Sequence, residues 1–177
     1  VGWAYQQLYQ LVNPPDTLTI EGRQAIVATL IPVPTQTCVP GLVTEPLVAV
    51  QLTNGYALAI AVDSCHFVFT ATDPQGATAT QLASQIDSVY LYLDRDGNAG
   101  SISATDTLIA VSRLQSGRAS FDVGALAIAG GGGSRTINVV AKLNLLNCRN
   151  GNTIAFALAD SSSVVFDRAA RMTGSFP

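Results

Sequence analysis

Alternation of hydrophobic and polar residues, the period of a β-strand with one buried face, dominates this chain. The alternating runs are short. They predict strands at residues 1–12, 17–20, 24–33, 46–53, 57–62, 66–72, 86–93, 107–111, 119–123, 136–143, 153–159 and 164–166. Only residues 79–84 favour a helical turn.

Turn-forming residues separate these runs. Gly, Pro, Asn and Asp gather at 40–41, 54–55, 73–76, 96–98, 130–133 and 150–152. The glycine run at 130–133 is expected to form a hairpin turn or a flexible surface loop. Many short strands with turns about every 8 to 12 residues indicate a β-sandwich. We therefore predict an all-β fold: a single β-sandwich, jelly-roll-like, of about ten strands.

The first twelve residues stand apart in this pattern. Trp3, Tyr5, Tyr9 and Leu11 fall on one face of the predicted strand, because they occupy odd positions. The sequence Asn13-Pro14-Pro15-Asp16 then ends the strand, since proline cannot donate to a ladder.

This break divides the chain into an N-terminal strand with its hinge (1–15) and a β-sandwich domain (16–177). The terminal strand either pairs with its own sheet or adds, as a donor strand, to the sheet of another copy. In the second arrangement its four apolar side chains would bind in a groove of the neighbouring subunit.

The composition narrows the classes of partner. Charged residues make up 12% of the 177 residues, about half of the ~25% usual in soluble domains, and hydrophobic residues make up 48%. A surface so poor in charge fits a protein whose outer face is largely covered by copies of itself or by a wall. The alternative is a secreted domain whose surface is rich in Ser, Thr, Asn and Gln. The net charge of −3 and the pI near 4.8 argue against nucleic-acid binding.

Two further features concern the compartment. No apolar run approaches the ~18 to 20 residues that a membrane-spanning helix needs. The chain begins at Val1 without Met or a basic region, which a cleaved leader or a trimmed chain would explain.

The three cysteines, Cys38, Cys65 and Cys148, lack the CxxC spacing of zinc and redox sites. In an oxidising compartment two of them could form a disulfide. The sequence is compatible with each of the three possible pairings and with three free thiols.

A cluster of oxygen-bearing side chains is the sharpest local motif. Asp94, Asp96 and Asn98 alternate along the chain, with glycines that permit a tight loop, and Asp106 follows. Calcium takes six to eight oxygen ligands, so side chains at every second position can converge on it. We predict a calcium site formed by these four residues; the alternative is a solvated turn.

The loop departs from an EF-hand. No helix is predicted before it, Ala99 stands where the EF-hand has glycine, and no Glu occupies the twelfth position. Asp106, one residue later, can close the site instead.

The surrounding segment resembles one found in secreted β-sandwich modules of bacteria and archaea. Residues 89–98 and 106–110 are similar to a strand, a D-x-N/D-G-N-G loop and a D-T-L-L strand. A Pro-Gly turn at 40–41 and a glycine-containing turn before the strand at 136–141 fit the same plan. The resemblance covers roughly residues 39–166.

Such modules occur in surface-layer, adhesin and filament proteins. In plan the chain is similar to extracellular filament subunits of the TasA, archaeal bundling-pilus and cannula types. That resemblance implies polymerisation through donated N-terminal strands, with calcium at some joints and a location at the cell surface.

Catalytic motifs have little support. His66 is the single histidine, which excludes a zinc site of several histidines. Cys65 and His66 are neighbours on a predicted strand and therefore point to opposite faces. The glycine run is followed by Ser134-Arg135, so it is not a phosphate-binding loop. We expect no enzyme activity.

The resulting prediction is a structural subunit of an extracellular filament or pilus on a prokaryotic cell surface. Its partners would be copies of itself. One alternative is a monomeric, calcium-stabilised adhesion or carbohydrate-binding module. Tyr56, Tyr90 and Tyr92 would then be its stacking residues. However, Tyr90 and Tyr92 share one strand face, and such tyrosines are more often part of the core. A viral capsid jelly-roll is a further alternative.

Overall fold

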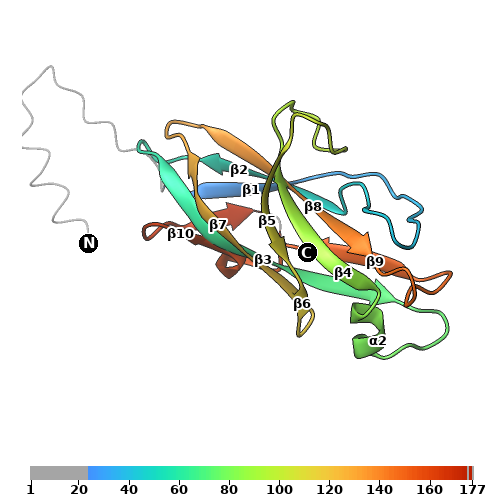
Figure 1. Cartoon of the computed structure of the whole chain (residues 1–177). Coiled ribbons are helices and arrows are strands. Elements are labelled where there is room, and N and C mark those ends of the chain that lie inside the picture. Colours follow the sequence, from blue (N-terminus) through green and yellow to red (C-terminus); the bar gives the residue numbers. More distant parts are fainter. Residues whose placement is uncertain (1–23, 175, 177) are drawn as a thin grey trace, which may run out of the picture.

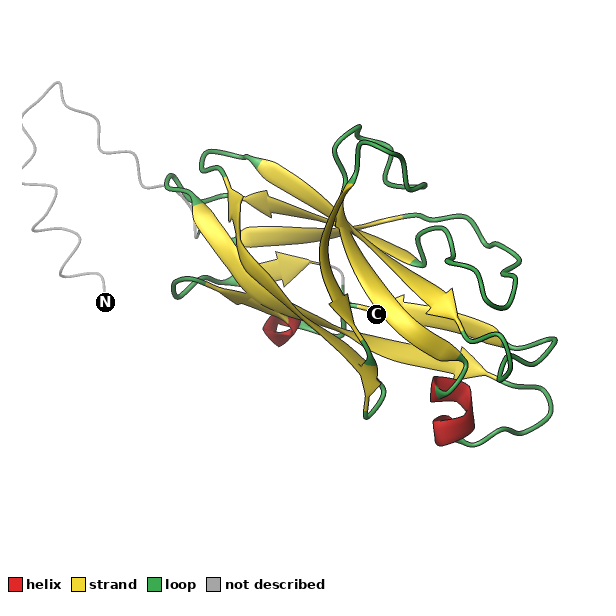
Figure 2. Ribbon diagram, viewed as in Figure 1, coloured by secondary structure: helices red, strands yellow, loops and turns green. Residues whose placement is uncertain are grey.

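The computed structural model describes residues 24–174 and 176, and nearly all of its regular structure is β-strand (Figures 1 and 2). Eleven strands of this part of the chain form two sheets. The all-β sandwich predicted from the alternation is confirmed.

Sheet A has six strands in the order β11-β1-β2-β8-β4-β5. Their bounds are Met172–Gly174 (β11), Ile26–Ile31 (β1), Val48–Asn54 (β2), Ser134–Leu143 (β8), Ile86–Leu93 (β4) and Thr107–Ser112 (β5). Neighbouring strands are antiparallel except β1 and β11, which are parallel.

Sheet B has five strands, with β3 at its centre. The order is β10-β3-β7-β6, and β9 pairs with a second stretch of β3. Their bounds are Val164–Phe166 (β10), Ile60–Thr72 (β3), Arg118–Ile128 (β7), Leu114–Gln115 (β6) and Thr153–Ala157 (β9). A short helix, α2 (Ala79–Ala83), and a 3-10 helix, η1 (Ser161–Ser163), complete the described elements.

The core lies between the inner faces of the two sheets. In sheet A, alternate residues such as Val50 and Leu52 of β2 and Val139 of β8 are fully buried. In sheet B, Phe67 is fully buried and its ring meets that of Phe121 edge-to-face, with centroids 6.2 Å apart. The apolar residues of the alternating pattern are therefore the ones on the inner face of each sheet.

One predicted break between two strands is absent from the structure. Residues 57–62 and 66–72 were expected to form two strands, whereas β3 runs without interruption through Asp63 and Ser64. A register shift between Val62 and Ser64 opposite β7 marks a β-bulge. The bulge leaves Asp63 exposed and returns Cys65 to the inner face, so the strand continues across a change in the hydrophobic alternation.

The glycine run at 130–133 is also different from the expected hairpin turn or flexible loop. It joins β7 to β8 and therefore crosses from one sheet to the other. Gly131 and Gly132 donate to the carbonyls of Tyr56 and Asn54 at 2.8 Å each. A Cβ on Gly130 would lie 2.1 Å from the Ala57 carbonyl oxygen, so only glycine fits against this neighbouring turn.

The predicted N-terminal strand and hinge (1–15), the predicted strand at 17–20 and the first residues of the proposed 16–177 domain lie outside the described residues. The short strands β6 and β11 were not predicted, because β6 has only two residues and β11 has a single apolar side chain, Met172. No helix of the described part is long and apolar enough to cross a membrane.

Candidate calcium-binding loop

The loop between β4 and β5 brings the predicted acidic residues together. These strands are antiparallel neighbours, and Leu93 is paired with Thr107. Because Asp94 follows Leu93 and Asp106 precedes Thr107, both carboxylates lie at the base of the loop. The backbone N–H of Asp94 also donates to the Thr136 carbonyl of β8 at 3.0 Å, which fixes one end of the loop to the sheet.

Three carboxylates converge at this base. One side-chain oxygen of each of Asp94, Asp96 and Asp106 lies within 4.8 Å of the others. Asp94 Oδ1 accepts hydrogen bonds from the backbone N–H groups of Asp96 (3.1 Å) and Gly97 (2.8 Å). Asp96 Oδ1 accepts one from the backbone N–H of Asn98 (2.8 Å). The first turn of the loop thus wraps around its own acidic side chains.

Asp106 closes the loop. Its Oδ1 accepts from the Arg95 backbone at 2.9 Å, and its Oδ2 accepts from the Ser103 backbone at 2.8 Å. Each ionised carboxylate oxygen has two lone pairs, so these bonds leave acceptor capacity for a cation. Asp106 therefore connects both halves of the loop and can still act as a ligand.

The electrostatics of the cluster favour a bound cation. The described residues form no salt bridge with Asp94, Asp96 or Asp106. The neighbouring Arg95 directs its Nε to the Thr107 hydroxyl at 3.4 Å. Hydrogen bonds from the Asn98 backbone and then from the Ser103 side chain lower the pKa of Asp96, which keeps this carboxylate ionised. Like charges so close together repel, and a divalent cation between them would relieve that repulsion.

Asn98 is placed in the same loop, but its amide has an internal partner. Its Nδ2 donates to the Ser101 hydroxyl at 2.9 Å. The structure thus groups Asp94, Asp96 and Asp106, while the role of Asn98 as a ligand stays a prediction. Gly97 has φ +80°, which explains the glycine at the tightest point of the turn.

Glu45 is a functional candidate that the sequence did not reveal. Its Oε2 accepts a hydrogen bond from the Ile102 backbone at 3.2 Å, so the loop reaches the chain just before β2. In the strand order, β8 lies between β4 and β2, and the loop must therefore cross the outer face of β8. Ala99 of the loop is buried, which shows that the loop packs down instead of projecting outward. No local motif marks Glu45, because it is 57 positions from its partner.

The tyrosines proposed as a carbohydrate platform are not on one surface. Tyr56 packs against the core, and its hydroxyl accepts from the Arg171 backbone at 2.9 Å. Tyr90 and Tyr92 are half-buried on the outer face of sheet A, since the residues that alternate with them in β4 are buried in the core. The expectation that Tyr90 and Tyr92 belong to the core was therefore wrong.

The Cys65–His66 pair behaves as the strand geometry predicts. Cys65 is buried in the core and His66 lies on the opposite face of β3. Burial raises the pKa of Cys65 to about 12, so its thiol is protonated at neutral pH and is a poor nucleophile. These two residues do not form a nucleophile–base pair.

The predicted subunit-binding residues Trp3, Tyr5, Tyr9 and Leu11 lie outside the described residues.

The comparisons with known proteins add no relative: no protein-family model matches the chain, and no curated protein matches it significantly.

Proposed function

We propose that this chain is a structural subunit of an extracellular filament or pilus on a prokaryotic cell surface, and that its β4–β5 loop binds calcium. The observation that carries the proposal is the convergence of Asp94, Asp96 and Asp106 within 4.8 Å, without a basic partner among the described residues. The remaining support comes from the surface of the sandwich.

Calcium is the cation that best suits this loop. It accepts irregular geometry and takes oxygen ligands from carboxylates, backbone carbonyls and water. A loop that folds around three carboxylates and is held at Thr136 and Glu45 supplies such ligands on a fixed base. The bound ion would stiffen a long connection between two adjacent strands.

The edge of sheet A supports contact with other copies. β5 pairs with β4 on one side, and no described strand pairs with its other side. Leu108 and Val111 of β5 are 46% and 55% exposed. An open edge with exposed apolar side chains is a template on which a strand from another chain can add.

A second apolar surface lies at the opposite end of β8 from the acidic loop. Leu42, Leu145 and Leu146 are exposed, and Leu146 is 88% exposed. The segments that carry them touch, because Gly41 and Leu143 are joined by a hydrogen bond of 3.1 Å. Contacts between copies through both surfaces would bury these apolar side chains. A subunit covered in this way needs few surface charges.

Assembly would follow from strand addition. Residues 1–12 of one copy would pair with an open sheet edge of the next, with Trp3, Tyr5, Tyr9 and Leu11 in a groove of that neighbour. The experiment is deletion of residues 1–12, followed by sedimentation and circular dichroism. We expect a folded β-protein that no longer sediments as polymer. A deleted chain that still polymerises would refute the donor-strand mechanism.

The monomeric adhesion or carbohydrate-binding module remains the second candidate. Its specific support is the position of Tyr90 and Tyr92, side by side on the outer face of β4 and paired in register with Val111 and Leu108. Binding of a defined glycan by a monodisperse monomer would favour this function. Closed shells instead of open fibres would favour the capsid alternative.

A further inference from the structure

Two of the three cysteines line the same groove. Cys38 and Cys148 both face a cleft of about 760 Å³ that lies between the 33–40 connector and the 148–155 segment. Both are partly buried and pack against the core, whereas Cys65 is buried inside β3 of sheet B. The fold therefore separates one cysteine from the other two, which the sequence alone did not do.

Backbone pairing brings the two segments together. The connector between β1 and β2 runs along β8, with hydrogen bonds from Gly41 to Leu143 (3.1 Å) and from Leu143 to Leu42 (3.0 Å). After Leu143 the chain turns: Asn144 Oδ1 accepts from the backbones of Leu146 and Asn147 at 2.9 Å each. This turn directs the following residues, including Cys148, back along the connector that carries Cys38.

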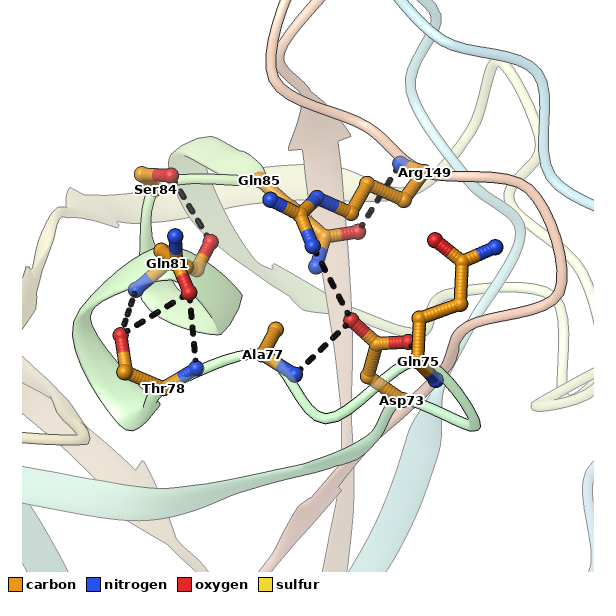
Figure 3. Close-up of polar contacts among 8 residues, drawn as sticks. All are labelled: Asp73, Gln75, Ala77, Thr78, Gln81, Ser84, Gln85 and Arg149. Carbon is orange, nitrogen blue, oxygen red and sulfur yellow. Dashed lines mark hydrogen bonds and ion pairs between the residues drawn. The ribbon is translucent and has the colours of Figure 1, made fainter.

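The Cys148 side of the groove is firmly held. Cys148 Sγ donates to the Gln85 carbonyl at 3.5 Å, and Asn147 Nδ2 donates to the Ser84 carbonyl at 3.2 Å. Figure 3 shows the contacts of Arg149, the next residue in the chain: its backbone N–H donates to Gln85 Oε1 at 3.5 Å, and its guanidinium lies 3.6 Å from Asp73. Cys148 thus sits between two anchored residues.

The surroundings of both thiols favour their protonated form. Burial is the main reason that the pKa of Cys148 is raised; a backbone hydrogen bond at Asn144 lowers it, and the electrostatic effects of Asp87 and then of Cys38 raise it. Burial raises the pKa of Cys38 as well. Neither thiol is readily ionised at neutral pH, which suits a structural disulfide better than a catalytic thiolate.

We propose that Cys38 and Cys148 form an intramolecular disulfide in an oxidising compartment and that Cys65 stays a buried thiol. The oxidant is a small-molecule or protein disulfide. Each cysteine thiol loses one hydrogen, the Cys38–Cys148 S–S bond forms, the S–S bond of the oxidant breaks, and the oxidant leaves as two thiols. The bond would tie the β1–β2 connector to the β8–β9 segment.

Such a bond would stabilise the sandwich, because it closes a loop of about 110 residues. For a domain of this size, the usual stabilisation by one disulfide corresponds to a rise in Tm of about 5–15 °C. The oxidised chain should therefore melt at a higher temperature than the same chain in a reductant.

The test uses the full chain equilibrated in a mixture of reduced and oxidised glutathione. It is then denatured, alkylated, weighed by intact mass spectrometry and mapped by proteolysis. We expect one alkylated thiol per chain at Cys65, and one linked peptide pair that contains Cys38 and Cys148. The rate of oxidation should rise with pH, because the reacting species is the thiolate.

Single variants make the test decisive. C38S and C148S should each lose the linked peptide and the Tm difference between oxidised and reduced samples. C65S is the matched control and should keep both. Three alkylated thiols, glutathione adducts without the internal link, a link that includes Cys65 or a link between chains would each overturn the proposal.

Discussion

At the scale of single residues, the acidic loop is folded by hydrogen bonds from its own backbone to Asp94 and Asp96. The structure brings the carboxylates of Asp94, Asp96 and Asp106 together, while their role as calcium ligands with Asn98 stays a prediction. Glu45 was beyond sequence reasoning, because its contact with the loop depends on the strand order of sheet A.

The loop carboxylates give the first prediction. Asp96→Asn should weaken calcium binding at least tenfold, because it removes one of three charged ligands while keeping the acceptor for the Asn98 backbone. Isothermal titration calorimetry of the full chain measures this. Asp63→Asn is the matched control, since Asp63 is an exposed carboxylate on β3 outside the cluster. Equal affinities in both variants, or no calcium binding by the unaltered chain, would contradict the assignment.

The pKa of Asp96 gives a second prediction, made without calcium. The hydrogen bond from the Asn98 backbone holds the pKa of Asp96 in the folded chain below its ordinary value of 3.8. The charge of Asp96 therefore contributes stability above pH 3.8, and this contribution is lost as the pH falls through the lower folded pKa. The chain should therefore melt at a slightly higher temperature than Asp96→Asn at pH 7. The difference should shrink below pH 3.8. A difference that stays constant with pH would rule out this origin.

Gly130 gives a third prediction at the residue scale. Gly130→Ala places a Cβ 2.1 Å from the Ala57 carbonyl oxygen, so one of the two turns must move. We expect a loss of about 3 kcal/mol or more in the free energy of unfolding, measured by urea denaturation. Gly100→Ala is the control, because its Cβ would meet only Asn98 Oδ1, at 3.8 Å. Equal stability of the two variants would contradict the packing described for the inter-sheet turn.

At the scale of elements, strands that read as one regular run were predicted well, whereas β3 and the second half of β7 (124–128) were not. The predicted bounds of β4 and β10 agree with the structure, because each reads as one uninterrupted run. The prediction split β3 because Asp63 and Ser64 break its alternation, and a bulge absorbs such a break only when a partner strand is present. A single sequence contains no information on that partner.

The central position of β3 leads to a fourth prediction. Phe67→Ala should lower the free energy of unfolding by about 3–5 kcal/mol, because Phe67 is fully buried against Phe121 and the sheets cannot close around the cavity. Leu146→Ala, at an 88% exposed position, should change it by less than about 0.5 kcal/mol. Urea denaturation of both variants would show whether the core lies where the structure places it.

At the scale of the whole molecule, two sheets with little surface charge leave one apolar edge and one apolar end exposed. A lone sandwich gains nothing from exposed leucines and valines, whereas a subunit that copies of itself surround buries them. These exposed residues support the proposed polymer, in which calcium bound at the acidic loop would set the rigidity of each unit.

The most direct test of this account is electron microscopy of the full, purified chain in millimolar calcium and in a chelator. We predict uniform open fibres in calcium and their loss or fraying in the chelator, because the unoccupied Asp94–Asp106 loop no longer holds β4 and β5 in one conformation. Dispersed single particles under both conditions would contradict the proposed filament subunit and would point to the monomeric binding module.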